Sequence, residues 1–383
     1  MMMEMEEGIM HSFYGEKYVC AKHFEDYYLQ KYIKEHGHLG QCSYCGKRGK
    51  IFDMKGFMEF IENKLSQRLC SLDEADLPLV SSYCDDEDDE FIRKNSLGCY
   101  ILPEKAERYE SVEDLMYSYG LYTSDDNLNK DIACCFNEGI WTVRNVWEGD
   151  IDEELSYAWN YFVTMVKHKR RYTFFQDSYF VRQNEWQDDI LTTINQLCRT
   201  VLISTLPKDT LIYRGRSNDT GIPRTSFEDL TAPPVGCAKE NRMSAVGISM
   251  FYGALDSDTS KKEIQKGDSK VVIDLGEFVL KRKLVVIDLF KIPKCLSFWM
   301  PQYYLEYKFL EKFHLEITQP VMENPGIEYV PTQIFTEYIR FLNKKHIDGI
   351  IYRSSETKRK NIVLFYDNAS SKEILRLDKT YVV

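Results

Sequence analysis

Apolar residues recur at helical spacing through much of the first two hundred residues. In the segment MKGFMEFIENKL, the apolar side chains share one stripe of a helix: Phe57, Met58, Ile61 and Leu65. Asp53 precedes this segment and is the expected N-cap, because its short carboxylate accepts hydrogen bonds from the free N–H groups of a first helical turn. The pattern predicts a helix that begins just after Asp53.

More helices are predicted in the same region. Ser111 and Asp114 resemble a capping box with the shorter acid, and Gly120 follows the segment. Apolar periodicity predicts further helices at residues 127–141, 152–169 and 184–204. The acidic run at 83–91 is expected to be a solvated loop, because its like charges repel one another. We therefore expect an all-α helical middle domain.

The pattern changes after Pro207, where β-branched residues gather in short runs. These runs are typical of strands and alternate with helical stretches: TLIYRGR, KVVIDL, LVVIDL, DGIIYRS and NIVLFY. A chain of 383 residues is also too long for a single core. We predict a multidomain α+β protein with a small N-terminal module at 1–52, a helical domain at 53–205 and a mixed α/β domain at 206–383.

Charge and composition narrow the classes of partner. The formal net charge is -11, whereas binding to a phosphate backbone needs a concentrated cationic surface, so nucleic acid is not the expected partner. No run of eighteen apolar residues occurs, and the first ten residues lack the pattern of a secretory signal. The eleven cysteines show no regular spacing, which favours free thiols and a metal site in a reducing compartment. We expect a cytoplasmic protein without a membrane span.

Two pairs of metal-ligating residues lie near the N-terminus. Cys20 and His23 are separated by two residues, as are Cys42 and Cys45, so each pair can bind one ion from a single turn. Four such ligands close a tetrahedral set and leave no position for water. The spacing predicts a structural Zn²⁺ that holds together a segment too short to bury its own core.

Several motifs of the C-terminal half resemble the RES domain family. They are YRGR at 213–216, NRMSAVGISMFYGALDSDTSKKE at 241–263, DGIIYRSS at 348–355 and NIVLF at 361–365. The family is named for its Arg, Glu and Ser, it resembles ADP-ribosyltransferases in fold, and many members are toxins of toxin–antitoxin pairs that consume NAD⁺. The resemblance implies an enzyme that breaks the nicotinamide–ribose bond of NAD⁺.

The family pattern falls on four residues of this sequence: Arg214, Tyr252, Glu263 and Ser354. Loss of nicotinamide passes through a ribosyl cation, which the Glu263 carboxylate would stabilise. Arg214 would bind the pyrophosphate through its planar fork of donors, and Tyr252 would contact a ring or the ribose. Ser354 would orient the substrate or Glu263, with Asn361 assisting nearby in cofactor binding. Each residue by itself is also compatible with an ordinary structural role.

Three neighbouring residues compete for the same roles. Arg242 and Glu240 are the nearest rivals to the pair of Arg214 and Glu263, and Arg216 could exchange with Arg214 in another loop conformation. A break at residues 256–258 separates Tyr252 from a new helix that Asp258 or Ser260 could cap.

The N-terminal part resembles the HEPN/RES N-terminal region that precedes some RES domains. The elements are VC..H, CSYCG and VKHKRRYTFF at 166–175. Active HEPN ribonucleases place a His a few positions after an Arg and a polar residue, but Arg144 and Asn145 are followed by VWEGDIDE. We therefore do not expect ribonuclease activity.

The resemblance leaves the ADP-ribose acceptor open. The leading hypothesis is transfer to water or phosphate by a toxin or bacterial defence effector, and the first alternative is a protein ADP-ribosyltransferase. A second alternative is a sensing protein whose RES part is degenerate. An inhibitory antitoxin or regulatory partner and a homo-oligomer are compatible with all three, and no residue separates NAD⁺ from NADP⁺.

Overall fold

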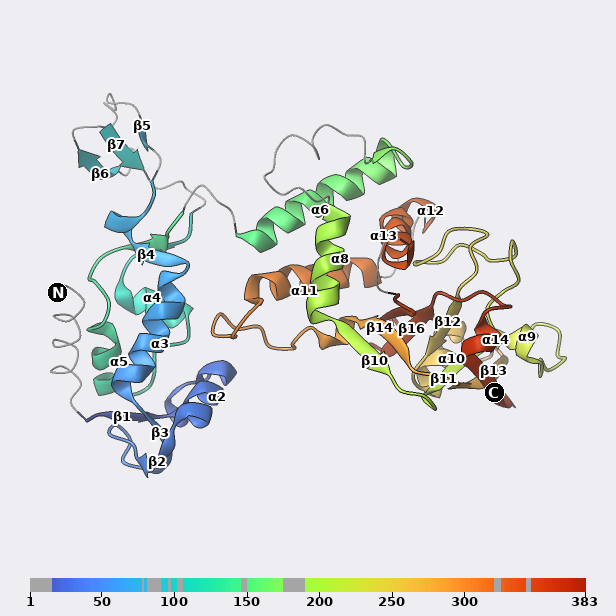
Figure 1. Cartoon of the computed structure of the whole chain (residues 1–383), viewed down its shortest axis with the longest axis horizontal. Coiled ribbons are helices and arrows are strands. Elements are labelled where there is room, and N and C mark those ends of the chain that lie inside the picture. Colours follow the sequence, from blue (N-terminus) through green and yellow to red (C-terminus); the bar gives the residue numbers. More distant parts are fainter. Residues whose placement is uncertain are drawn as a thin grey trace. The chain divides into compact units, whose positions relative to one another are not determined.

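The computed structural model describes residues 16–77, 79–80, 91–95, 98–101, 106–145, 150–174, 190–319, 325–341 and 346–383. The chain forms two compact units (Figure 1). Unit 1 consists of Met1–Asp150 together with Cys295–Tyr304, and unit 2 consists of Ile151–Lys294 together with Leu305–Val383. The division of the sequence at 52 and 205 remains a prediction. Residues 83–90 of the acidic run lie outside the described residues.

Unit 1 begins with a small antiparallel sheet and two helices. The sheet has the order β1-β3-β2, formed by Tyr18–Cys20, Arg48–Asp53 and His38–Gln41. Helix α2 (Tyr27–His36) follows β1, and helix α3 (Met54–Ser66) follows β3. The side chain of Asp53 accepts a hydrogen bond from the Gly56 N–H, so the predicted cap is confirmed. All four residues of the predicted stripe are buried.

The rest of unit 1 combines short helices with short strands. Ser111 caps α4 (Val112–Ser118) by accepting from the Asp114 N–H, as predicted. Helix α5 (Asp126–Ala133) ends eight residues earlier than the predicted helix, and Trp141 begins a strand instead. Two three-stranded sheets are present: β4 (Leu69–Ser71), β9 (Trp141–Val143) and β8 (Arg108–Tyr109), and β5 (Leu79–Val80), β7 (Gly98–Ile101) and β6 (Phe91–Asn95).

The region predicted to be all-α therefore contains strands as well. These strands have two to five residues, too few to display the alternation of apolar and polar positions that reveals a strand in a sequence. Some of them also pair with partners far along the chain: Cys70 of β4 lies opposite Thr142 of β9.

A short segment from the C-terminal half of the sequence completes the core of unit 1. Trp299 is 3% exposed and belongs to the same hydrophobic cluster as α3 and α4. Its ring N–H donates to the Tyr119 carbonyl at 2.7 Å. The Lys64 ammonium of α3 donates to the Met300 carbonyl at 2.7 Å. The segment Cys295–Tyr304 is thus an integral part of unit 1.

Unit 2 is built on one eight-stranded mixed sheet, as the sequence predicted. Its order is β10-β14-β15-β16-β12-β11-β13-β17. Only β14 and β15 run parallel among the pairs described; the others are antiparallel. The strands are Ile203–Leu206 (β10), Leu211–Ser217 (β11), Phe251–Ala254 (β12), Ile273–Leu280 (β13), Leu284–Asp288 (β14), Gly349–Arg353 (β15), Lys360–Leu364 (β16) and Leu375–Val382 (β17).

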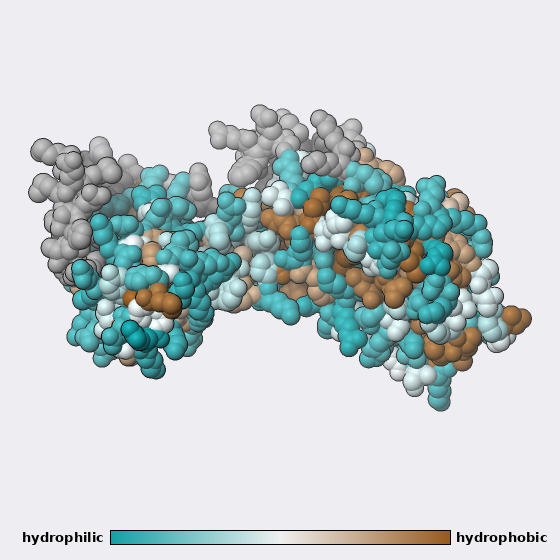
Figure 2. Space-filling view, turned by 60° about the horizontal axis from the view of Figure 1, so that its bottom comes forward, coloured by the Kyte–Doolittle hydropathy of each residue, from teal (hydrophilic) through white to brown (hydrophobic). Residues whose placement is uncertain are grey.

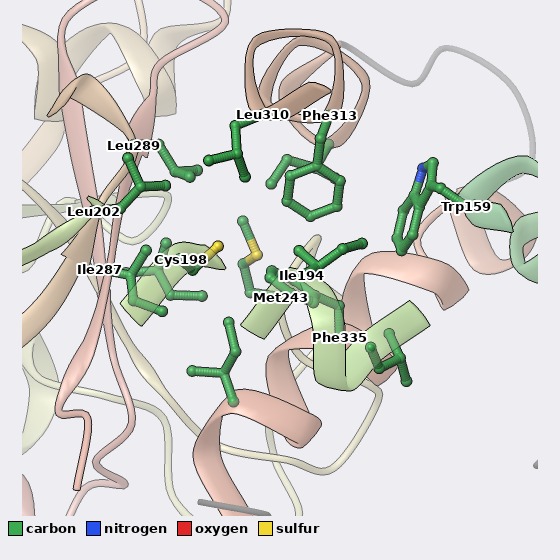
Figure 3. Close-up of a cluster of buried hydrophobic side chains, with 14 of the residues drawn as sticks. Trp159, Ile194, Cys198, Leu202, Met243, Ile287, Leu289, Leu310, Phe313 and Phe335 are labelled. Carbon is green, nitrogen blue, oxygen red and sulfur yellow. The ribbon is translucent and has the colours of Figure 1, made fainter. Parts of the chain in front are cut away.

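Helices of unit 2 pack on one face of this sheet. They are α6 (Ile151–His168), α8 (Ile190–Val201), α11 (Tyr304–Thr318) and α13 (Val330–Phe341). Figure 3 shows Trp159 of α6, Ile194 of α8, Phe313 of α11 and Phe335 of α13 gathered around Met243, which comes from a loop. Both α6 and α8 were predicted; residues 184–189 of the predicted 184–204 helix lie outside the described residues.

The surface is mainly polar on the face shown in Figure 2, where apolar residues form separate patches. Among the helices that the structure describes, none has the length and apolar character needed to cross a membrane.

Candidate active site

A cavity of about 670 Å³ opens in unit 2 beside strands β11 and β12. These two strands share a single residue pair, Tyr213 with Ala254, whereas β11 and β13 are paired over seven residues. The sheet therefore separates beyond this pair, and side chains from both strands line the opening. Arg214, Tyr252, Glu263 and Asn361 all line the cavity, although they are far apart in the sequence.

Glu263 comes from α10 (Ser257–Gln265), which packs closely on β11. A side chain at Gly215 would approach Ile264 and Ile273 to 3.0 Å, so only glycine allows this contact without a shift. The cap of α10 is Asp256, which accepts from the Thr259 N–H at 2.9 Å, and not Asp258 or Ser260 as expected. Asp256 has an extended backbone, whereas the two expected residues already lie inside the helix.

One oxygen of the Glu263 carboxylate is held by two side chains. The Ser354 hydroxyl donates to Oε1 at 2.5 Å, and the Asn361 amide donates to the same atom at 2.7 Å. The Ser354 oxygen in turn accepts from the backbone N–H groups of Glu356 and Thr357. Ser354 is fully buried, and Asn361 is 5% exposed. This network fixes the carboxylate and leaves Oε2 available to the cavity.

The Arg214 guanidinium is held by strand β12. One terminal nitrogen donates to the Tyr252 carbonyl, and the guanidinium carbon lies 5.4 Å from the centre of the Phe251 ring. Burial, with Arg216 nearby, lowers the pKa of Arg214 to about 9. Its Nε is buried without a hydrogen-bond partner among the described residues. A buried cation in this state favours an anionic ligand.

Tyrosines also line the cavity. The Tyr252 hydroxyl lies 3.0 Å from the Ser244 hydroxyl, and burial raises the pKa of Tyr252. Tyr352 also lines the cavity, and burial raises its pKa while Tyr252 and Glu263 add to the effect. We did not identify Tyr352 from the sequence. The available signal was its place in the motif: Tyr352 lies in β15, two residues before Ser354, which directly follows that strand.

The three residues that compete for these roles, Arg242, Arg216 and Glu240, differ in their contacts. Arg242 lines the cavity, donates to the carbonyls of Ile317 and Gln319 at the end of α11, and lies over the Tyr329 ring. Arg216 donates to the Thr231 carbonyl at 2.7 Å and is not among the cavity-lining residues. Glu240 lines the cavity. The structure therefore brings Arg214, Tyr252, Glu263, Ser354 and Asn361 together at one site.

The four predicted metal ligands also come together, at the edge of the β1-β3-β2 sheet. The ligand atoms of Cys20, His23, Cys42 and Cys45 all lie within 4.8 Å of one another. Sulfur atoms of Cys20 and Cys45 are 3.7 Å apart, and Cys42 Sγ is 3.4 Å from His23 Nε2. A tetrahedral zinc with bonds of about 2.3 Å to sulfur sets sulfurs about 3.8 Å apart. Burial lowers the pKa of His23, which favours the neutral form that binds metals.

Comparison with known families finds two matches. Residues 213–381 match the RES domain, and residues 35–180 match HEPN/RES N-terminal domain 1. The chain belongs to the RES family and carries a HEPN/RES-type N-terminal region. This membership indicates a toxin-like function related to NAD⁺ in general. No curated protein matches the chain.

Proposed function

We propose that this protein is a RES-type toxin or defence effector that cleaves the nicotinamide–ribose bond of NAD⁺ and transfers ADP-ribose to water or phosphate. The observation that supports it most is the Glu263 carboxylate, fixed by Ser354 and Asn361 through one oxygen in the wall of a cavity that Arg214 also lines. Such a carboxylate is oriented before the substrate binds, as electrostatic catalysis requires.

Bond cleavage in this reaction builds positive charge on the nicotinamide ribose. The C1′–nitrogen bond breaks, its electron pair leaves with nicotinamide and neutralises the pyridinium, and the ribose becomes an oxocarbenium ion. The free oxygen of Glu263 stabilises that charge and binds a ribose hydroxyl. Water or phosphate then adds to C1′, and water loses a proton in that step. The energy gained is specific to the transition state, because the ground-state ribose carries no such charge.

The other site residues bind and orient the dinucleotide. Arg214 binds the pyrophosphate. Only one of its N–H groups donates to the Tyr252 carbonyl, so the buried guanidinium keeps further donors for the phosphate oxygens. Asn361 lines the cavity and holds Glu263 through its amide, so it orients the carboxylate toward the substrate. Tyr252 and Tyr352 provide ring faces and hydroxyls along the wall.

We further propose that the cluster of Cys20, His23, Cys42 and Cys45 binds one structural Zn²⁺. The 3.7 Å and 3.4 Å separations suit tetrahedral coordination, and four protein ligands leave no open position for catalysis. Zinc would cross-link the β1 end to the turn after β2.

The experiment is to incubate the full-length protein with NAD⁺ and separate the products by chromatography. We expect two products, nicotinamide and either free ADP-ribose or its phosphate ester. We expect Arg214→Ala to abolish the release of nicotinamide. Arg376→Ala is the matched control, because Arg376 lies on β17 and is paired with Asp378 at the surface. ADP-ribose attached to protein, in place of free ADP-ribose, would favour the alternative of a protein ADP-ribosyltransferase. Absence of nicotinamide release contradicts the proposal and favours the sensing alternative.

A further inference from the structure

We propose that Glu240 binds the adenosine ribose and makes the site selective for NAD⁺ over NADP⁺. The inference rests on the proposed function, because it concerns the same cavity. Besides Glu263, two carboxylates line the cavity, those of Glu356 and Glu240, and Glu240 comes from the loop before β12.

The loop that bears Glu240 is fixed on both sides of that residue. The Gly247 N–H donates to the Ala238 carbonyl, and the Gln333 amide of α13 donates to the Asn241 carbonyl at 2.9 Å. Met243 is fully buried among the helices of unit 2, as Figure 3 shows. The carboxylate of Glu240 is therefore attached to a rigid backbone.

The Glu240 carboxylate is available to a ligand. Its side chain is partly buried, and no hydrogen bond or ion pair joins it to any residue that the structure describes. The nearest feature is α12 (Pro325–Glu328), where a side chain at Gly326 would meet Glu240 Oε2 at 3.4 Å. A half-desolvated acceptor of this kind is stabilised by hydroxyl donors.

The geometry of NAD⁺ assigns this carboxylate to the adenosine half. With the nicotinamide ribose at Glu263 and the pyrophosphate at Arg214, the adenosine extends along the remaining wall. The lining of the cavity includes apolar residues suited to a flat base: Pro233, Ile248 and Met250. A carboxylate beside an adenosine ribose accepts hydrogen bonds from its 2′ and 3′ hydroxyls, which is how dinucleotide-binding folds select NAD⁺.

The 2′-phosphate of NADP⁺ would meet an unfavourable environment here. In NADP⁺ the 2′ hydroxyl, a hydrogen-bond donor, is replaced by a phosphate dianion, which the Glu240 carboxylate would repel. The nearest cation in the sequence, Arg242, also lines the cavity, but both of its terminal nitrogens donate to carbonyls, those of Ile317 and Gln319. Arg214 is assigned to the pyrophosphate. Arg353 and Lys266 also line the cavity; Arg353 directly precedes Ser354 in the chain, and Lys266 directly follows α10, the helix that bears Glu263.

The test compares kcat/KM for NAD⁺ and NADP⁺ in the wild type, Glu240→Gln and Glu311→Gln. Glu311 is an exposed residue of α11 and serves as the matched control. We expect the wild type and the control to prefer NAD⁺ by about tenfold or more, the value of a hydrogen bond to a charged group. Glu240→Gln should lose most of this preference through KM, with kcat and the melting temperature unchanged.

The outcomes separate this inference from the proposed function. Equal use of both dinucleotides by the wild type, or an unchanged preference in Glu240→Gln, overturns the role of Glu240 while NAD⁺ cleavage still stands. Consumption of neither dinucleotide overturns the proposed function and this inference with it. The wild-type ratio needs no variant, so the inference can be tested even if Glu240→Gln fails to fold.

Discussion

Replacing Trp299 with alanine tests whether a segment from the RES part of the sequence completes unit 1. Trp299 is 3% exposed, and its ring centre lies 5.2 Å from that of Phe298 and 6.0 Å from that of Phe60. Truncating a buried Trp costs about 3–5 kcal/mol. The lost donor also leaves the Tyr119 carbonyl without its partner. We expect unit 1 to lose about 4 kcal/mol, within that range.

Hydrogen–deuterium exchange of the full chain measures this loss locally. Amides of α3 and α4 should exchange roughly two to three orders of magnitude faster in Trp299→Ala, at 1.4 kcal/mol for each factor of ten. Peptides of β13 in unit 2 serve as the internal reference. Tyr303→Ala is the control variant, because Tyr303 belongs to the same segment but is 37% exposed. Unchanged protection of α3 in Trp299→Ala refutes the reasoning.

Three further predictions concern separate parts of the chain. Ser354→Ala removes a hydrogen bond to the Glu263 carboxylate, which is worth about 1.5–3 kcal/mol. The value of kcat/KM for NAD⁺ should therefore fall roughly tenfold to a hundredfold. A fall of less than about twofold would be evidence against the network around Glu263. The purified protein should contain one zinc per chain by elemental analysis, and Cys42→Ser should lose it; a full zinc content in that variant contradicts the site. Burial lowers the pKa of His314 to about 4, so the unfolded chain takes up a proton that the folded chain does not as the pH falls from about 6.5 to 4. Unit 2 should therefore lose stability across this window, on the order of 3 kcal/mol, in urea unfolding. His314→Gln should flatten that slope.

Much of the fold could be predicted because the signals are local. Asp53 and Ser111 cap helices through bonds to residues three positions away, and five strands of unit 2 overlap the β-branched runs of the sequence: β11, β13, β14, β15 and β16. The strands of unit 1 gave no such signal, because they are short and some of them, such as β4 and β9, pair across a long stretch of sequence. The membership of Trp299 in the core of unit 1 also escaped prediction, since nothing in its neighbouring residues identifies a partner 180 positions away.

The candidate site was predicted from the family pattern rather than from periodicity. The order of Arg214, Glu263 and Ser354 identified the residues, but only the fold shows that Ser354 and Asn361 share one oxygen of Glu263. The difference between Arg214 and Arg242 could not be seen in the sequence either. Both residues line the cavity, but Arg214 is held by the Tyr252 carbonyl of β12, whereas Arg242 donates to carbonyls at the end of α11.

The most direct test of the central claim separates binding from bond cleavage at Glu263. Glutamine keeps an oxygen that can accept from Ser354 and Asn361 but lacks the charge that stabilises the ribosyl cation. We predict that Glu263→Gln binds NAD⁺ by calorimetry about as tightly as the wild type, while nicotinamide release falls by roughly a hundredfold or more. Wild-type nicotinamide release by Glu263→Gln would contradict the account.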